Sequence, residues 1–142
     1  IGDEEMTIKE RGSFPTTTPE ETMALVIDFF KKYEDQLVGI GIGSFGPIDI
    51  HRDSATYGYI TSTPKLAWQN FDFVGTMKQA FPIPIAWTTD VNAAAYGEYV
   101  FGKGKGLSSV VYYTIGTGVG GGALQMGALL RDSAIRRWDI CW

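Results

Sequence analysis

The clearest pattern of apolar and polar positions predicts a helix that begins after residue 18. Thr18 suits the N-cap, Pro19 suits the first helical position, and Glu21 stands where it can close a capping box. Apolar residues then recur at helical spacing, at Met23, Val26, Ile27 and Phe30. Lys31 and Lys32 suit the C-terminal end of the helix dipole. The segment therefore predicts an amphipathic helix.

Apolar runs that are rich in β-branched residues or glycine predict strands elsewhere. Partial alternation of apolar and polar residues predicts an edge strand over residues 6–14. The runs at 37–45 and 83–89 suit buried strands, the first of them covered on both faces. The runs at 108–116 and 122–130 suit the two arms of a hairpin.

The segments between these strands complete a mixed order of elements. Residues 47–64 predict a small hairpin that leads into an irregular loop. Residues 71–81 predict a short helix, and residues 91–102 predict an alanine-rich helix that is ended by Gly102. Because helices alternate with strands, we expect a fold of the mixed α/β class.

Length and composition exclude several classes of protein. The 142 residues are enough for one domain with a core, and 44% hydrophobic with 20% charged residues is ordinary globular composition. A net charge of −4 argues against nucleic acid as a partner. No apolar run approaches the roughly 18 residues of a membrane span, and no signal-peptide pattern is visible. We therefore expect a cytoplasmic location and no membrane partner.

Two residue counts bear on metal chemistry. The single cysteine, Cys141, excludes an intramolecular disulfide. With only one histidine, His51, there is no Cys/His cluster for a structural zinc site. The sequence therefore predicts no metal ligands of its own.

A glycine-rich stretch, IGTGVGGG, begins at the end of the run at 108–116. It places glycines at 116, 118, 120, 121 and 122, and it lacks both the Lys-Ser/Thr end of a Walker loop and a following helix. A tight turn here would offer backbone N–H groups and the Thr117 hydroxyl to a phosphate. The alternative is a glycine-bulged hairpin without a ligand. Taken alone, the stretch favours neither interpretation.

Asp90 stands where a predicted strand ends and a predicted helix begins. Ligands in open α/β sheets gather at the carboxyl ends of strands, so a carboxylate at this point is well placed for chemistry. Aspartate is also a preferred N-cap, and a capping role is the simpler interpretation from position alone. The two roles are compatible, because a cap needs only one carboxylate oxygen.

Two polar loops offer groups that suit a sugar. The Gly46-Pro47 turn could bring backbone beside a ligand. The segment TSTPKLAW offers three hydroxyls, including that of Thr63, and the Trp68 ring for stacking. Most polar loops of this kind are only surface, so each of these signals is weak by itself.

Four segments taken together resemble the ROK family (repressors, open reading frame proteins and sugar kinases), and most closely its bacterial fructokinases. They are GIGSFGPIDI, TSTPKLAW, TTDVNAAAYGE and YYTIGTGVGGGALQMG, in the family's order and spacing. The resemblance covers about residues 2–130. It implies the actin-like ATPase (ribonuclease H-like) fold, with ATP and sugar in the cleft between two α/β domains, and this chain would be mostly the N-terminal domain.

The resemblance also implies roles for individual residues. Asp90 would be the general base that takes the proton from the sugar hydroxyl as it attacks the γ-phosphate of Mg-ATP. The phosphate-binding residues would be Gly116, Thr117, Gly118, Gly120 and Gly121, and the sugar-binding residues would be Gly46, Pro47, Thr63, Thr89 and Asp90. Many family members have Asn before the catalytic Asp. Thr89 at that position favours the fructokinase branch.

The ends of the chain depart from the family pattern. Residues 1–130 are interpreted as an incomplete N-terminal domain with the start of the nucleotide-binding half. Residues 131–142 are interpreted as an out-of-frame tail, because a one-base shift of suitable synonymous codons encodes Gly-Leu-Ser-His-Pro-Glu-Met-Gly-His, the family's next segment. The family implies zinc and often a homodimer, but the zinc ligands are absent here. We therefore expect this chain by itself to be inactive or nearly so.

The leading hypothesis is thus ATP-dependent phosphorylation of a hexose, D-fructose to fructose 6-phosphate. One alternative is a kinase for glucose, mannose or an aminosugar. Another is a sugar-binding regulator of the same family, although such regulators usually lose the catalytic Asp and carry an N-terminal helix-turn-helix. A third is a remnant of the fold that binds neither ATP nor sugar.

Overall fold

The computed structural model describes residues 1–5, 7–116 and 119–130. Helices and strands alternate, as the pattern of the sequence predicts. In chain order the elements are α1 (Pro19–Lys31), β1 (Ile40–Ser44), β2 (Tyr59–Ile60), β3 (Phe71–Asp72), α2 (Phe73–Ala80), β4 (Ile85–Thr89), α3 (Asp90–Val100), β5 (Ser109–Ile115), β6 (Val119–Gln125) and β7 (Ala128–Leu129). Short 3-10 turns lie at Glu34–Gln36 and Leu66–Trp68. None of the described helices is long and apolar enough to cross a membrane.

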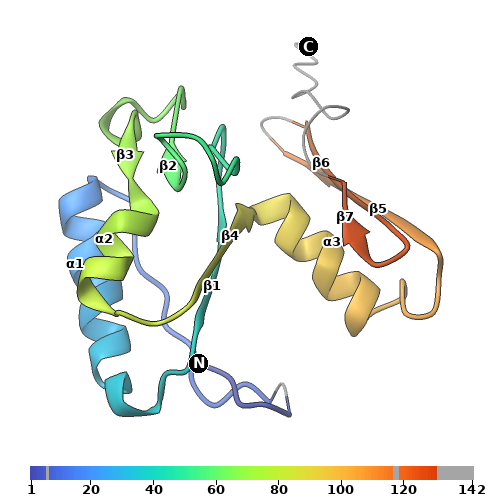
Figure 1. Ribbon diagram of the computed structural model, residues 1–142, viewed down its shortest axis with the longest axis horizontal. Coiled ribbons are helices and arrows are strands. Elements are labelled where there is room, and N and C mark those ends of the chain that lie inside the picture. Colours follow the sequence, from blue (N-terminus) through green and yellow to red (C-terminus); the bar gives the residue numbers. More distant parts are fainter. Residues whose placement is uncertain (6, 117–118, 131–142) are drawn as a thin grey trace.

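The strands of the described residues form three small sheets. β1 and β4 are parallel and in register from Ile40 opposite Ile85 to Ser44 opposite Thr89. β2 pairs with β3, and β5, β6 and β7 form an antiparallel sheet in that order. Helix α3 continues directly from β4 and lies between the β1–β4 pair and the β5–β6–β7 sheet, whereas α1 and α2 lie on the opposite side of β1 and β4 (Figure 1). The α3 helix therefore links the two parts of the molecule.

The main hydrophobic core lies between α1, α2 and the β1–β4 pair. Its buried members are Met23, Ile40, Ile60, Trp68, Val74, Met77, Phe81 and Trp87. Aromatic rings interlock within it: Trp68 meets Phe45 and Phe71 edge to face, with ring centroids 5.6 and 5.4 Å apart. Such contacts add to the free energy gained from burial alone.

The first helix confirms its sequence signals. The Thr18 hydroxyl accepts a hydrogen bond from the Glu21 backbone N–H at 3.4 Å, and Pro19 opens the helix. The apolar face that begins at Met23 packs on the core. Lys31 lies in the last turn, where its charge favours the helix dipole.

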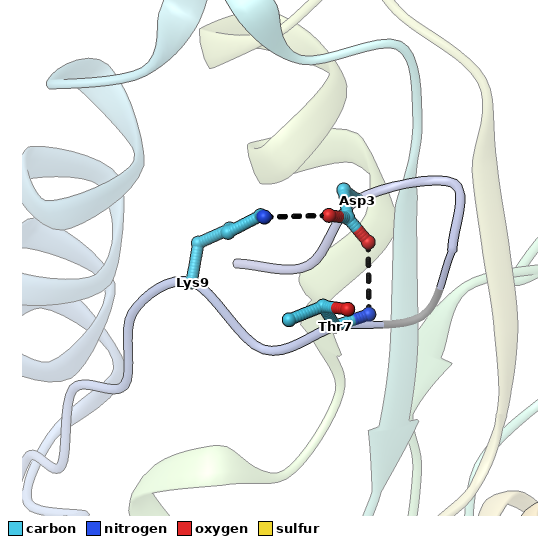
Figure 2. A network of polar contacts seen from close by, with 3 residues as sticks. All are labelled: Asp3, Thr7 and Lys9. Atoms are coloured by element: carbon cyan, nitrogen blue, oxygen red, sulfur yellow. Dashed lines mark hydrogen bonds and ion pairs between the residues drawn. The ribbon is translucent and has the colours of Figure 1, made fainter.

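The predicted edge strand over residues 6–14 is wrong for the part of it that the structure describes. Gly2 and Ile8 form only an isolated antiparallel bridge. Figure 2 shows the reason: Asp3 accepts a hydrogen bond from the Thr7 backbone N–H at 2.8 Å and forms an ion pair with Lys9 at 2.7 Å. The Lys9 ammonium and this N–H hold the pKa of Asp3 below its usual value. The side chain thus folds the segment back on itself.

Two other boundaries differ from the sequence prediction, and one predicted hairpin is confirmed. The strand expected over 37–45 is limited to Ile40–Ser44, and the glycines within it are exposed. Helix α3 ends at Val100, capped by Phe101, before Gly102 is reached. The hairpin expected within 47–64 is present: Ile48 and Ile60 form an antiparallel bridge, which is flanked by hydrogen bonds from the Asp49 N–H to the Tyr59 carbonyl and from the Thr61 N–H to the Pro47 carbonyl, while β2 also pairs with β3.

The arm expected at 122–130 is divided into two strands. β6 already begins at Val119 and ends at Gln125, and β7 follows after a tight turn. Met126 and Gly127 make that turn with positive φ angles of 50° and 78°. The apolar run at 122–130 therefore predicts a single strand, although the chain reverses direction within it.

Candidate functional site

The carboxyl ends of β1 and β4 form one edge of the parallel pair. Ser44 lies opposite Thr89 at this edge, and Asp90 follows as the first residue of α3. Gly46 and Pro47 follow β1 at the same edge. The topology therefore brings together the catalytic candidate and three of the sugar-binding candidates, as expected for a site at strand ends.

Asp90 is not the N-cap of α3, so the capping interpretation is wrong. Thr89 has the extended backbone of a cap (φ −74°, ψ 156°), and its hydroxyl accepts from the Asn92 backbone N–H at 3.2 Å. Asp90 is one residue further on and is exposed, with Oδ1 accepting from the Val91 N–H at 2.8 Å. No described residue hydrogen-bonds its Oδ2. The carboxylate therefore has one oxygen that is open to a ligand.

A second contact fixes the junction between β4 and α3. The Asn92 side-chain Nδ2 donates to the Thr88 hydroxyl at 3.3 Å. Together with the Thr89 cap, it ties the first turn of the helix to the last residues of the strand. The N-terminus of α3 also favours a carboxylate, because the helix dipole is positive there. Asn92 was not among the predicted site residues, although its spacing of four from Thr88 is the signal that could have found it.

The glycine-rich stretch is only partly a turn. Gly120, Gly121 and Gly122 lie within β6, opposite Thr114, Tyr113 and Tyr112 of β5. Gly116 follows β5 and is exposed, and a Cβ added there would meet no atom within 4 Å. Two predicted phosphate-binding residues, Thr117 and Gly118, lie outside the described residues. The structure therefore places Gly116 at a hairpin end and the later glycines in a strand.

Packing explains two of the strand glycines. A Cβ at Gly122 would lie 2.5 Å from the carbonyl oxygen of Val91 and 3.0 Å from the Asn92 nitrogen. A Cβ at Gly120 would lie 2.8 Å from the Thr114 hydroxyl. Glycine is thus required at 122 because the backbone of α3 approaches β6 closely. This requirement is steric and needs no ligand.

The sugar-binding candidates of the two loops are held by hydrogen bonds. The Pro47 carbonyl accepts from the Thr61 N–H at 2.8 Å and from its hydroxyl at 3.1 Å, which joins the 46–47 turn to the 61–63 segment. Thr63 is 2% exposed, and its hydroxyl accepts from the Lys65 N–H at 3.3 Å. The structure therefore brings Pro47 and the segment with Thr63 together, and the Thr63 side chain supports the loop from inside.

The prediction of Trp68 as a stacking group is wrong. Its ring is 1% exposed, and its Nε1 donates to the Thr17 carbonyl at 2.8 Å. Its place in a polar loop suggested access to solvent, but the loop folds over the core. Phe45 follows β1 at this edge, and the Lys65 ammonium lies 4.4 Å from its ring centroid. No sequence pattern links two residues that are so far apart in the chain.

The described residues were also compared with what a protein-bound metal ion requires. No group of three or more His, Cys, Asp or Glu side chains there could hold a metal ion. His51 lies in the 49–58 loop, and Cys141 lies outside the described residues. The described residues therefore do not fit the zinc that the family resemblance implies.

Comparisons with known proteins agree with one another. The profile described as the ROK family matches residues 1–134. A fructokinase of Streptococcus mutans is 54% identical over 130 residues (92% of this chain, 44% of the relative), and a fructokinase of Lactococcus lactis subsp. cremoris is 54% identical over 127 residues (89% and 42%). This chain thus spans less than half the length of these curated relatives.

A solved structure extends the comparison to three dimensions. The ROK family glucokinase from Streptomyces griseus, in complex with glucose and AMPPNP, matches with a TM-score of 0.75 and 28% identity, covering 92% of this chain and 41% of its own. This likeness confirms the predicted α/β fold of the actin-like ATPase type. The tail interpretation of residues 131–142 lies outside the described residues.

Proposed function

Because the chain belongs to the ROK family, we propose that the protein is a sugar kinase that transfers the γ-phosphate of Mg-ATP to a hexose, converting D-fructose to fructose 6-phosphate. One observation carries the proposal. Asp90 is exposed at the carboxyl end of β4 and is freed from capping by Thr89, so a carboxylate oxygen is available as a base. Such a base typically contributes about 10²–10⁴-fold to the rate.

In the proposed phosphoryl transfer, the residues around this carboxylate have separate roles. Asp90 takes the proton of the hydroxyl that attacks the γ-phosphate, while Mg²⁺ bound to ATP offsets the charge on the phosphates. The 46–47 turn and the segment with Thr63 orient the sugar from one side, and the Thr89 hydroxyl, which accepts from the Asn92 N–H, keeps its own proton to donate to a sugar oxygen. The phosphates lie against the hairpin end with Gly116, Thr117 and Gly118, followed by Gly120 and Gly121.

Fructose is preferred to glucose as the proposed acceptor for two reasons. The two relatives named fructokinase are 54% identical to this chain, whereas the glucokinase of known structure is 28% identical. Thr89 stands where many family members have Asn, and an amide and a hydroxyl bond different sugar oxygens. The exposed carboxylate favours a kinase over a regulator that binds sugar without catalysis.

The test is ATP-dependent phosphorylation by a full-length protein that carries residues 1–130. ADP formation is followed with fructose, glucose, mannose and an N-acetylated aminosugar, each titrated at fixed ATP. The proposal expects the highest kcat/KM with fructose. A higher kcat/KM for glucose would reject the proposed substrate, and no ADP formation with any sugar would reject the proposed activity. For the 142-residue chain alone we expect little or no activity, because the cleft that catalysis needs would be incomplete.

A further inference from the structure

Two glycines on separate elements touch the first turn of α3. On β1, a Cβ at Gly43 would lie 2.8 Å from the Ala93 Cβ and 3.3 Å from the Asp90 Cα. On β6, a Cβ at Gly122 would lie 2.5 Å from the Val91 carbonyl oxygen. The turn that carries Asp90 is therefore in close contact with two strands that are not paired with each other.

Other glycines on the same strand and helix have open space around them. A Cβ at Gly41, two residues before Gly43 on the same strand, would meet no atom within 4 Å. The same holds for Gly97, which lies further along α3. Figure 1 shows α3 lying between β1 on one side and β6 on the other. At the other end of α3, a Cβ at Gly104 would lie 3.0 Å from the Glu98 carbonyl oxygen, but that glycine lies in the loop after the helix. On β1, the close approach is thus limited to Gly43, beside the turn that carries Asp90.

We propose that Gly43 and Gly122 are positioning residues, which together set the place of Asp90 relative to the sugar-binding end of β1 and the phosphate-binding end of the β5–β6 hairpin. This inference rests on the proposed function, because the position of Asp90 affects a rate only if Asp90 acts as the base. A methyl group at either position moves the first turn of α3 away from one strand. Misplacement of reacting groups by about 1 Å can lower a rate by about 10²-fold.

Gly43 is the sharper of the two sites for a test. Gly43 and Ala93 are both exposed, so the helix can shift to relieve the 2.8 Å approach without opening a buried core. At Gly122 the added methyl would meet backbone atoms, which cannot rotate away. A Gly122→Ala variant can therefore fail to fold, whereas Gly43→Ala is expected to fold and to move Asp90.

The kinetic test compares Gly43→Ala with Gly41→Ala in a full-length protein that carries residues 1–130. We expect Gly43→Ala to lower kcat by about 10-fold or more, with the KM values for sugar and ATP changed by less than about threefold. Gly41→Ala should leave kcat and both KM values at the parent level. Equal kcat values for the parent and Gly43→Ala would overturn the proposal.

A compensating substitution separates positioning from stability. Adding Ala93→Gly to Gly43→Ala removes the 2.8 Å contact between the two Cβ positions. It also lowers the melting temperature further, because glycine is unfavourable inside a helix. Positioning predicts that the double variant is less stable but regains most of the lost kcat. A purely structural role predicts that kcat falls along with stability, which would overturn the proposal.

A measurement that does not depend on catalysis separates the proposed placement of Asp90 from the proposed kinase function. Amide NMR spectra of the 142-residue chain are compared for the parent, Gly43→Ala and the double variant. Shift changes at residues 90–93 that the second substitution reverses support the placement of the turn by Gly43. Shift changes confined to β1 overturn it. If the parent protein phosphorylates no sugar, the proposed function fails while this result still decides how the turn is placed.

Discussion

The two parts of the molecule are held together in different ways. The body, defined as α1, β1–β4 and α2, contains eight buried hydrophobic residues of one core, including Trp68 and Phe81, which are each 1% exposed. The hairpin unit, defined as α3 and β5–β7, contains only three described buried hydrophobic residues, Ala95, Ala123 and Leu124. On β5, alternate residues are 56–83% exposed: Val111, Tyr113 and Ile115.

The difference shows which kinds of contact fix the positions of the elements in each part. The body is stabilised by large side chains that interlock. The hairpin unit is stabilised by strand pairing and by the close contact between the α3 backbone and Gly122 of β6. Asp90 lies at the junction of the two, so its position depends on backbone contacts more than on a packed core.

The largest contrast is expected from truncating one aromatic residue in each part. Trp68→Ala removes a buried ring and its bond to Thr17, and it should lower the free energy of unfolding by about 3–5 kcal/mol. Tyr113→Ala on β5 should change it by less than about 0.5 kcal/mol, since that ring is 66% exposed. Urea unfolding followed by circular dichroism measures both. Comparable losses in the two variants would show that the outer face of β5 is packed.

A smaller effect is expected at the junction between the two parts. Thr89→Ala removes the hydroxyl that caps α3 and should lower the free energy of unfolding by about 1 kcal/mol. Thr89→Ser keeps a hydroxyl and should recover most of that loss. Urea unfolding of both variants, with Asp90→Ala alongside, identifies the cap, because alanine has no side-chain acceptor. A larger loss for Asp90→Ala than for Thr89→Ala would mean that Asp90 is the capping residue.

The smallest effect is expected in the loop of the body that Asp49 organises. The Ser54 and Thr56 hydroxyls hold the pKa of Asp49 below its usual 3.8, so its contribution to stability is present above that pH and is lost as the pH falls through the lower value. Asp49→Asn should therefore lower stability at pH 7 by more than at pH 3. Asp53→Asn, an exposed neighbour, is the control. A deficit that is equal at both pH values would contradict this account.

The sequence predicts the body better than the hairpin unit. Capping residues and helical spacing locate α1, because these signals are local and depend on a few neighbouring side chains. The strands that became β1 and β4 are also found, although the first is shorter than expected. The segment 6–14 was misread because the alternation of apolar residues does not reveal the turn that Asp3 makes with Thr7.

The glycines and the loops show what the sequence leaves open. Gly122 is required by the backbone of Val91, which is 31 positions away in the numbering, so no local pattern could identify the cause. Trp68 looked accessible because its neighbours are polar, but tertiary packing places it in the core. Asp90 was found as a candidate from its place after a strand. The sequence did not show that Thr89, and not Asp90, caps the helix.

The most direct test of the central claim measures catalysis with and without the Asp90 carboxylate. Asp90→Asn and Asp28→Asn are made in a full-length protein that carries residues 1–130; Asp28 is an exposed aspartate of α1 and serves as the matched control. The account predicts that Asp90→Asn lowers kcat for fructose phosphorylation by about 10²–10⁴-fold, while Asp28→Asn keeps the parent rate. An Asp90→Asn variant with the parent kcat would contradict the assignment of Asp90 as the base.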